Sequence, residues 1–87
     1  MIVDYLGEIM AQREVTIASV AELGKLIRAM RKESRLTQRD AAALCNVSVP
    51  YLNGLERGKV TAQIGKVLSV CQRFGIEIKL VLPGDEP

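Results

Sequence analysis

Apolar residues recur at helical spacing in the stretch from Ser19 to Glu33. Steps of three and four residues place such side chains on one face of an α-helix. Ser19 comes directly before them and is a favourable N-cap, because its hydroxyl can accept a hydrogen bond from a free N–H of the first turn. The pattern therefore predicts a helix over residues 19–33 whose apolar stripe consists of Val20, Leu23, Leu26, Ile27 and Met30.

Two shorter helices joined by a tight turn are predicted next. Thr37 can cap the first, which is rich in alanine and extends to Cys45. Asn46 follows, and asparagine is the residue other than glycine that most readily adopts a left-handed backbone, so it favours a sharp turn. Ser48 can cap the second of these helices, which extends to Arg57.

A fourth helix and one strand complete the predicted elements. Thr61 can cap this helix and Gly75 can end it, and its apolar face consists of Ile64, Val67, Leu68, Cys71 and Phe74. Apolar side chains then occupy alternate positions, and this period of two is typical of a β-strand. The sequence thus predicts a strand over residues 76–82, with one face formed by Ile76, Ile78, Leu80 and Leu82.

The N-terminal region allows two interpretations. Apolar residues at helical spacing between residues 2 and 10 predict a short amphipathic helix, whereas Val15 and Ile17 are compatible with an extended segment. Met10 is a second candidate for the true start of the chain. We therefore divide the chain into an extension (1–18), a helical domain (19–75), a strand (76–82) and a polar tail (83–87).

Composition excludes several classes of function. The chain has no histidine and two cysteines, so the commonest general base and a four-thiolate zinc site are both missing. Its first ten residues carry acidic but no basic side chains, unlike a signal peptide, and no run of apolar residues is long enough to cross a bilayer. We expect a cytoplasmic binding protein with no enzymatic activity, cofactor, metal or membrane partner. Cys45 and Cys71 are expected as small buried side chains, with a redox switch as the alternative.

Charge is distributed unevenly along the chain. Residues 25–66 carry nine basic and three acidic side chains, a net charge of +6, whereas residues 1–24 sum to −3 and residues 67–87 to −1. A concentrated basic surface is typical of a protein that binds a polyanion. An ordinary solvated helix face is the alternative.

The segment from Gln38 to Glu56 meets the structural requirements of a helix-turn-helix unit. Ala42 is small where the second helix must cross the first, and Asn46 suits the turn. The positions that must face inward are all apolar: Ala41, Cys45, Val47, Leu52 and Leu55. A helical hairpin with no role in DNA binding is the alternative.

Residues 21–82 resemble the Xre-type helix-turn-helix family of phage repressors and bacterial antitoxins, and most closely its HipB-like antitoxin regulators. The shared motifs are ELGKLIRAMRK, LTQ at Leu36–Gln38, LERGK at Leu55–Lys59 and a final strand like GIEIKLVL. The resemblance implies a mainly α, lambda-repressor-like domain of four to five helices. It also implies that Arg31, late in the first helix, forms a structural ion pair with Glu56.

The same resemblance implies which residues contact DNA. The recognition helix runs from Val49 to Arg57, and the resemblance places Ser48, Val49, Pro50, Tyr51 and Asn53 near bases or adjacent phosphates. Tyr51 either faces the groove of the DNA or packs against the domain. Phage repressors often carry glutamine where this chain has Val49 and Pro50, which cannot form bidentate hydrogen bonds with a base. Val49 can pack on a thymine methyl group and Asn53 can bond a base edge, so selectivity shifts towards dimer spacing and DNA shape. Near the phosphates the resemblance places Thr37 and Gln38, with charge supplied by Arg39, Arg57 and Lys59.

A single strand leaves its own backbone N–H and C=O groups unpaired. A second copy can supply the missing strand, as in HipB-like dimers, and a two-fold dimer suits a palindromic operator on double-stranded DNA. Pairing with residues 15–17 or 2–6 of the same chain is the alternative. Three functions remain open: an autoregulating antitoxin that binds a HipA-like kinase toxin, a stand-alone repressor, and a helix-turn-helix adaptor that binds only protein.

Overall fold

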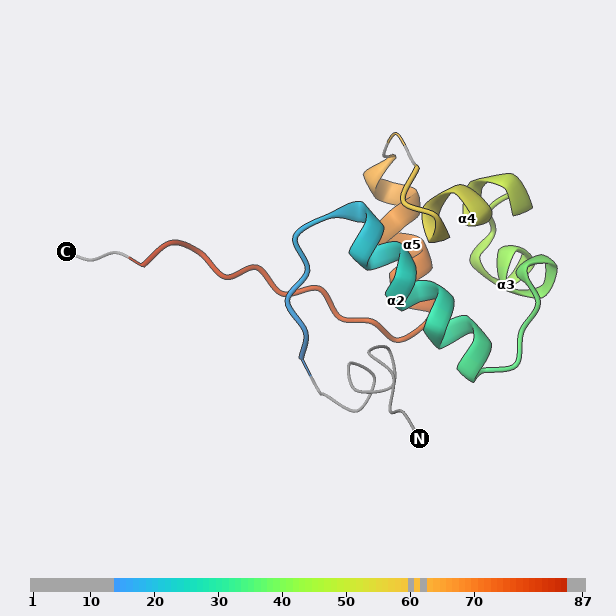
Figure 1. Cartoon of the computed structure of the whole chain (residues 1–87), viewed down its shortest axis with the longest axis horizontal. Coiled ribbons are helices and arrows are strands. Elements are labelled where there is room, and N and C mark those ends of the chain that lie inside the picture. The colour runs from blue at the N-terminus through green and yellow to red at the C-terminus, as the bar shows by residue number, and fades with distance from the viewer. Residues whose placement is uncertain (1–13, 60, 62, 85–87) are drawn as a thin grey trace.

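Four α-helices form the body of the described part of the chain (Figure 1). The structure is a computed structural model that describes residues 14–59, 61 and 63–84. Its helices are α2 (Val20–Glu33), α3 (Gln38–Cys45), α4 (Val49–Glu56) and α5 (Ile64–Arg73). In Figure 1, α2 crosses in front of α5, and α3 and α4 lie together at one end. The predicted mainly α fold is confirmed, whereas the helix predicted between residues 2 and 10 lies outside the described residues.

The first three helices begin at the N-caps that the sequence predicts. In each, the capping hydroxyl oxygen accepts a hydrogen bond of 3.0–3.1 Å from the N–H three residues later: Ser19 from Glu22, Thr37 from Asp40 and Ser48 from Tyr51. Each cap satisfies one backbone N–H that has no partner within its helix. These short-range contacts fix where α2, α3 and α4 start.

The start and the buried face of α5 differ from the prediction. Gln63, not Thr61, is the N-cap residue, and its side chain forms no capping hydrogen bond. The buried residues of α5 are Val67, Val70 and Cys71, with Phe74 packed beside them, whereas Ile64 and Leu68 are exposed. The helix is thus turned so that Val70, rather than Leu68, faces the other helices.

The core lies between α2, α3, α4 and α5 and consists of small and branched apolar side chains: Ile27, Ala41, Ala42, Cys45, Leu52, Leu55, Val67, Val70 and Cys71. Gly24 lets α2 approach the end of α4, because a Cβ atom at this position would lie 2.1 Å from the carbonyl oxygen of Leu55. This close approach brings the basic side of α2 next to the C-terminal half of α4.

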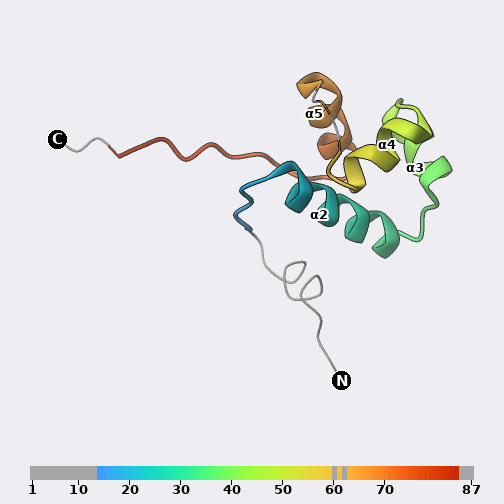
Figure 2. The ribbon, with the colours of Figure 1, turned by 45° about the horizontal axis from the view of Figure 1, so that its top comes forward.

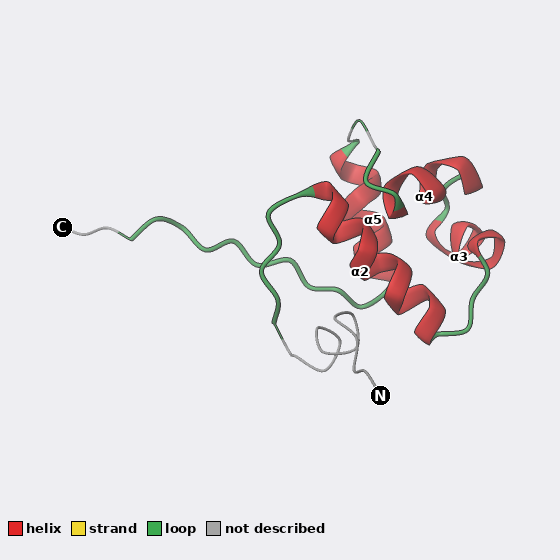
Figure 3. Ribbon diagram, in the orientation of Figure 1, coloured by secondary structure: helices red, strands yellow, loops and turns green. Residues whose placement is uncertain are grey.

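The C-terminal segment leaves the helical body in an extended path (Figures 1 and 2). Figure 3 shows only helices and loops among the described residues, so the predicted strand over residues 76–82 is not present in this single chain. The Ile76 N–H donates to the carbonyl oxygen of Cys71 at 2.8 Å. The Ile76 side chain packs against the core of its own chain and is not available to form the face of a strand. Beyond it, Leu80 is 82% exposed and Val81 94% exposed.

Pairing of this segment with the start of the described chain is also not seen. Residues 14–18 have no regular secondary structure, and no backbone hydrogen bond joins them to residues 77–84. One exposed ion pair, between Lys79 and Glu14, connects the two segments. Pairing with residues 2–6 lies outside the described residues. Within the described part of the chain, the backbone of residues 77–84 therefore has no backbone partner.

Candidate nucleic-acid interface

The turn between α3 and α4 has the geometry that a helix-turn-helix unit needs. Asn46 adopts a left-handed backbone, with φ 59° and ψ 43°. Its N–H donates to the carbonyl oxygen of Ala43 at 3.2 Å, and the Val47 N–H donates to that of Ala42 at 3.0 Å. These bonds close the end of α3 and direct the chain into α4. Ala42 is 2% exposed, so its small size serves helix packing, as predicted.

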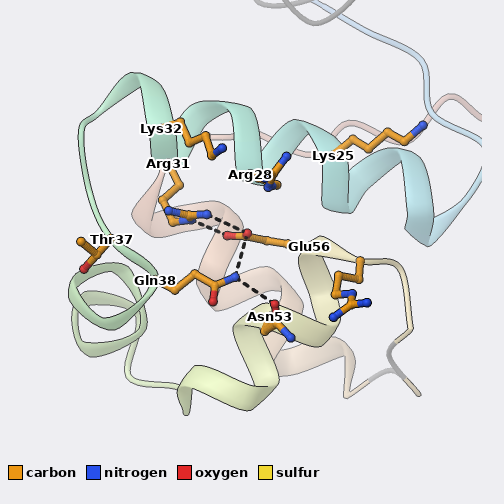
Figure 4. Close-up of a pocket in the computed structure, with 9 residues that line it drawn as sticks. Lys25, Arg28, Arg31, Lys32, Thr37, Gln38, Asn53 and Glu56 are labelled. Carbon is orange, nitrogen blue, oxygen red and sulfur yellow. Dashed lines mark hydrogen bonds and ion pairs between the residues drawn. The ribbon is translucent and has the colours of Figure 1, made fainter.

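A buried ion pair joins α2 to the C-terminal end of α4 (Figure 4). Arg31 Nε donates to Glu56 Oε2 at 2.6 Å and Arg31 Nη2 donates to Glu56 Oε1 at 3.0 Å. A third donor, Arg31 Nη1, bonds the carbonyl oxygen of Leu36 at 2.8 Å. The two side chains are only 9% and 1% exposed. A bidentate pair with this much burial is a strong and directional contact, and it ties α2, the α2–α3 link and α4 together.

Gln38 extends this network to α3. Its Nε2 group donates to Glu56 Oε1 and to Asn53 Oδ1, both at 3.1 Å, as the dashed lines in Figure 4 show. A glutamine amide has two N–H donors, and both are used here. The side chain therefore couples the first residue of α3 to α4.

A basic groove lies over this network, between α2 and the ends of α3 and α4. Its volume is about 730 Å³, and it is lined by Lys25, Arg28, Arg31, Lys32, Thr37, Gln38, Asn53, Glu56 and Arg57. Glu56 is the single acidic residue of this lining and is paired with Arg31. Lys25, Arg28 and Lys32 lie along one side of α2 in Figure 4 and are exposed, as is Arg57. The groove offers a positive surface for a chain of negative groups.

The start of α4 does not line the groove and presents apolar side chains to solvent. Val49 and Pro50 are exposed, whereas Tyr51 turns inward and packs against the core. The Tyr51 hydroxyl is buried without a hydrogen-bond partner among the described residues, and burial raises the pKa of its phenol. Lys66 Nζ lies 5.3 Å from the centre of the Tyr51 ring, within the range of a cation–π contact.

The predicted interface residues fall into three places. Thr37, Gln38, Asn53 and Arg57 line the basic groove. Ser48, Val49 and Pro50 lie at the exposed start of α4, and Tyr51 points into the core beside them. Arg39 and Lys59 are exposed but do not line the groove. Four of the predicted residues therefore share the groove, and the other six lie outside its lining.

Sequence reasoning did not assign Lys25, Arg28 and Lys32 to the interface. Their spacing of three and four residues, away from the apolar stripe of the same helix, was the signal available in the sequence. What makes these residues part of a groove is the position of α4 across from α2, which no local pattern contains.

Other kinds of site find little support in the described part of the chain. Cys45 and Cys71 are both buried free thiols, and burial raises the pKa of each, which favours the neutral thiol over the reactive thiolate. No cluster of three side chains suited to metal binding occurs among residues 14–59, 61 and 63–84. No described helix is long and apolar enough to span a bilayer.

Comparison with known proteins places the chain in a family. The sequence pattern described as "Helix-turn-helix domain" matches residues 22–81. An uncharacterized HTH-type transcriptional regulator of Sinorhizobium fredii, y4mF, is 44% identical over 69 residues, which cover 79% of this chain and 91% of that protein. The immunity repressor protein of Bacillus phage phi105 is 33% identical over 64 residues, which cover 74% of this chain and 44% of the repressor.

Solved structures share the fold. The restriction-modification controller protein C.AhdI of Aeromonas hydrophila matches with a TM-score of 0.61 and 26% identity, over 67% of this chain and 88% of that one. A chain of the HipA–HipB–O2–O3 complex matches with a TM-score of 0.70 over 82% of this chain and all of that one. Its identity is 14%, so this likeness concerns the fold alone. The chain belongs to the helix-turn-helix domain family of transcriptional regulators.

Proposed function

We propose that the protein is a dimeric transcriptional repressor that inserts α4 into the major groove of a palindromic operator. The observation that carries the proposal is the basic groove, which the C-terminal half of α4 lines while the start of the same helix is exposed. A positive track next to a helix that can enter the major groove matches the two needs of a DNA-binding module, phosphate contact and access to bases.

The groove supports a specific division of roles. Lys25, Arg28 and Lys32 project from α2 and can neutralise phosphates of one DNA strand, together with Arg57. The N-terminus of α3, capped by Thr37, adds free backbone N–H groups to the same region. Gln38 uses both of its side-chain N–H donors within the protein, so we assign it to holding α3 against α4.

The remaining predicted DNA contacts follow from their positions. The bases are contacted by Ser48, Val49 and Pro50, and Asn53 lies between these residues and the basic groove of the protein. Arg39 and Lys59 add positive charge at the edges of the interface. Tyr51 holds the start of α4 against the domain, because its ring packs on the core.

The C-terminal segment is the proposed dimer contact. Residues 77–84 have no backbone partner within the described chain, and Ile78, Leu80 and Leu82 are exposed. Pairing of this segment with that of a second copy satisfies the backbone groups and covers these side chains. Ile76 contributes by fixing the start of the segment to its own core.

A HipA-like kinase toxin is the proposed protein partner. The shared fold with a chain of the HipA–HipB–O2–O3 complex supports this proposal. The presence of a neighbouring gene for a kinase-like protein would favour an antitoxin, and its absence would favour a stand-alone repressor. A helix-turn-helix adaptor that contacts protein only is the other alternative, and it predicts no binding to duplex DNA.

Salt dependence of duplex binding tests the proposed function. If a dimer neutralises roughly 6–10 phosphates, its affinity falls by about 10³ or more between 50 and 200 mM salt. Fluorescence anisotropy with the DNA upstream of the protein's own gene, and with a scrambled duplex of the same composition, measures both affinity and selectivity. Binding that is absent, or that does not change with salt, would rule out the proposal and favour the adaptor.

A further inference from the structure

The exposed face of α4 is poor in free hydrogen-bonding groups. Val49 and Pro50 are exposed at its start, and Gly54, one turn after Pro50, has no side chain. A Cβ atom at Gly54 would have no neighbour within 4 Å, so this position is open to the outside. We define Val49, Pro50 and Gly54 as the outer ridge of α4.

Two polar side chains near the outer ridge already accept hydrogen bonds from within the protein. Ser48 Oγ accepts the capping hydrogen bond from the Tyr51 N–H. Asn53 Oδ1 accepts from Gln38 Nε2 at 3.1 Å, and Gln38 is in turn held by Glu56. Recognition of adenine by asparagine needs its oxygen and its amide N–H groups together. A bidentate contact with adenine would thus require Asn53 Oδ1 either to accept a second hydrogen bond or to release Gln38.

We infer that the outer ridge of α4 selects its operator through thymine methyl groups and not through side-chain hydrogen bonds to bases. The C5-methyl group of thymine is the feature of the major groove that an apolar side chain can recognise. Val49 supplies the apolar contact, and the missing side chain at Gly54 allows the helix backbone to approach the base pairs closely. This inference deepens the proposed function and rests on it.

Val49 has a matched control within the chain. Val20, like Val49, is the first residue of its helix. Val20 is 38% exposed and Val49 is 39% exposed. Val20 lies on α2 and does not line the basic groove. Val49→Ala and Val20→Ala therefore remove the same atoms from equally exposed sites, one on the outer ridge and one away from it.

The experiment removes single methyl groups from DNA. Duplexes that the protein prefers are selected from a random pool, and each thymine is then replaced by uracil, which differs only by the C5 methyl group. In parallel, each purine is replaced by its 7-deaza form, which removes the major-groove acceptor N7. Affinities are measured by fluorescence anisotropy for the wild-type protein, Val49→Ala and Val20→Ala, all checked for folding by circular dichroism.

We expect uracil to weaken binding about fourfold at one or two positions in each half-site, the effect of losing one buried methyl group. The wild-type protein and Val20→Ala show this loss, Val49→Ala does not, and the 7-deaza purines leave the affinity unchanged. Salt-sensitive, selective binding that responds to 7-deaza purines but not to uracil would overturn the inference and leave the proposed function standing. A protein that selects no duplex would overturn both.

Discussion

The helical body and the C-terminal segment differ in how their backbone groups are satisfied. In the body, hydroxyl caps close the starts of α2, α3 and α4, and a left-handed Asn46 closes the end of α3. Residues 77–84 have no such partners among the described residues, and their apolar side chains are exposed. The helices of the body thus find partners for their ends within the same chain, whereas the backbone of the segment finds none among the described residues, as the proposed dimer contact requires.

In the proposed dimer, the difference also separates two roles in DNA binding. The basic groove and α4 of each body would address one half-site. The proposed pairing of the segments would set how two bodies are joined, and hence the distance between half-sites. Changes in the body are therefore expected to alter folding and contact with DNA, and changes in the segment to alter assembly.

The largest effect is expected from removing the segment. A chain that ends after Ile76 keeps the residue that packs on the core and loses Ile78, Leu80 and Leu82. Burial of three such side chains contributes roughly 5–9 kcal/mol per copy before ordering costs. Sedimentation at micromolar concentration should show a dimer for the full chain and a monomer for the shortened one, with the helical circular dichroism of the body retained. A full-length monomer that still binds a palindrome tightly would show that the segment is not the dimer contact.

Within the body, the buried ion pair should be the most sensitive contact. Glu56→Ala leaves the charge of Arg31 buried without its carboxylate, which costs about 3–5 kcal/mol. Urea unfolding of Glu56→Ala should show this loss, and Arg31→Met should recover part of it in the double variant by removing the stranded charge.

The exposed pair between Lys79 and Glu14 provides the contrast. Lys79→Ala should change the free energy of unfolding by about 1 kcal/mol or less, because solvent screens exposed ion pairs. If Glu56→Ala unfolds at the same urea concentration as Lys79→Ala, Arg31 and Glu56 do not hold α2 to α4.

The close approach of α2 to α4 predicts a smaller effect. Gly24→Ala places a Cβ atom against the carbonyl oxygen of Leu55, and the resulting shift should cost about 1–3 kcal/mol. Gly65→Ala is the matched control, since a Cβ atom there meets nothing within 4 Å. It should stabilise α5 by about 0.5–1 kcal/mol. Thermal unfolding of the two variants should therefore shift in opposite directions, and equal shifts would contradict the packing described here.

Short-range chemistry explains which features were predictable from the sequence. The caps at Ser19, Thr37 and Ser48 and the turn at Asn46 depend on a few neighbouring residues. Contact between Arg31 and Glu56 came from the family resemblance, because 25 residues separate the partners.

Features that depend on tertiary packing were not predictable in the same way. Arg35 adopts a left-handed backbone, with φ 61°, in the link between α2 and α3, although no glycine or asparagine marks the position. Tyr51 turns inward because α4 meets the core on that side, and Ile76 joins the core because α5 ends close to it. The basic groove arises only when α2 and α4 meet. The sequence shows the charges but not the surface that they share.

The central claim, that the basic groove beside α4 follows the DNA backbone, is tested most directly by a pair of single-charge variants. Arg28→Gln removes a positive charge from the groove, and Arg73→Gln removes one from the exposed end of α5, outside it. Affinity for one duplex is measured over a range of salt concentrations. We expect Arg28→Gln to reduce the slope of log affinity against log salt by about 1 for each chain, whereas Arg73→Gln keeps the wild-type slope. Equal slopes for the two variants would contradict the assignment of the groove to the DNA backbone.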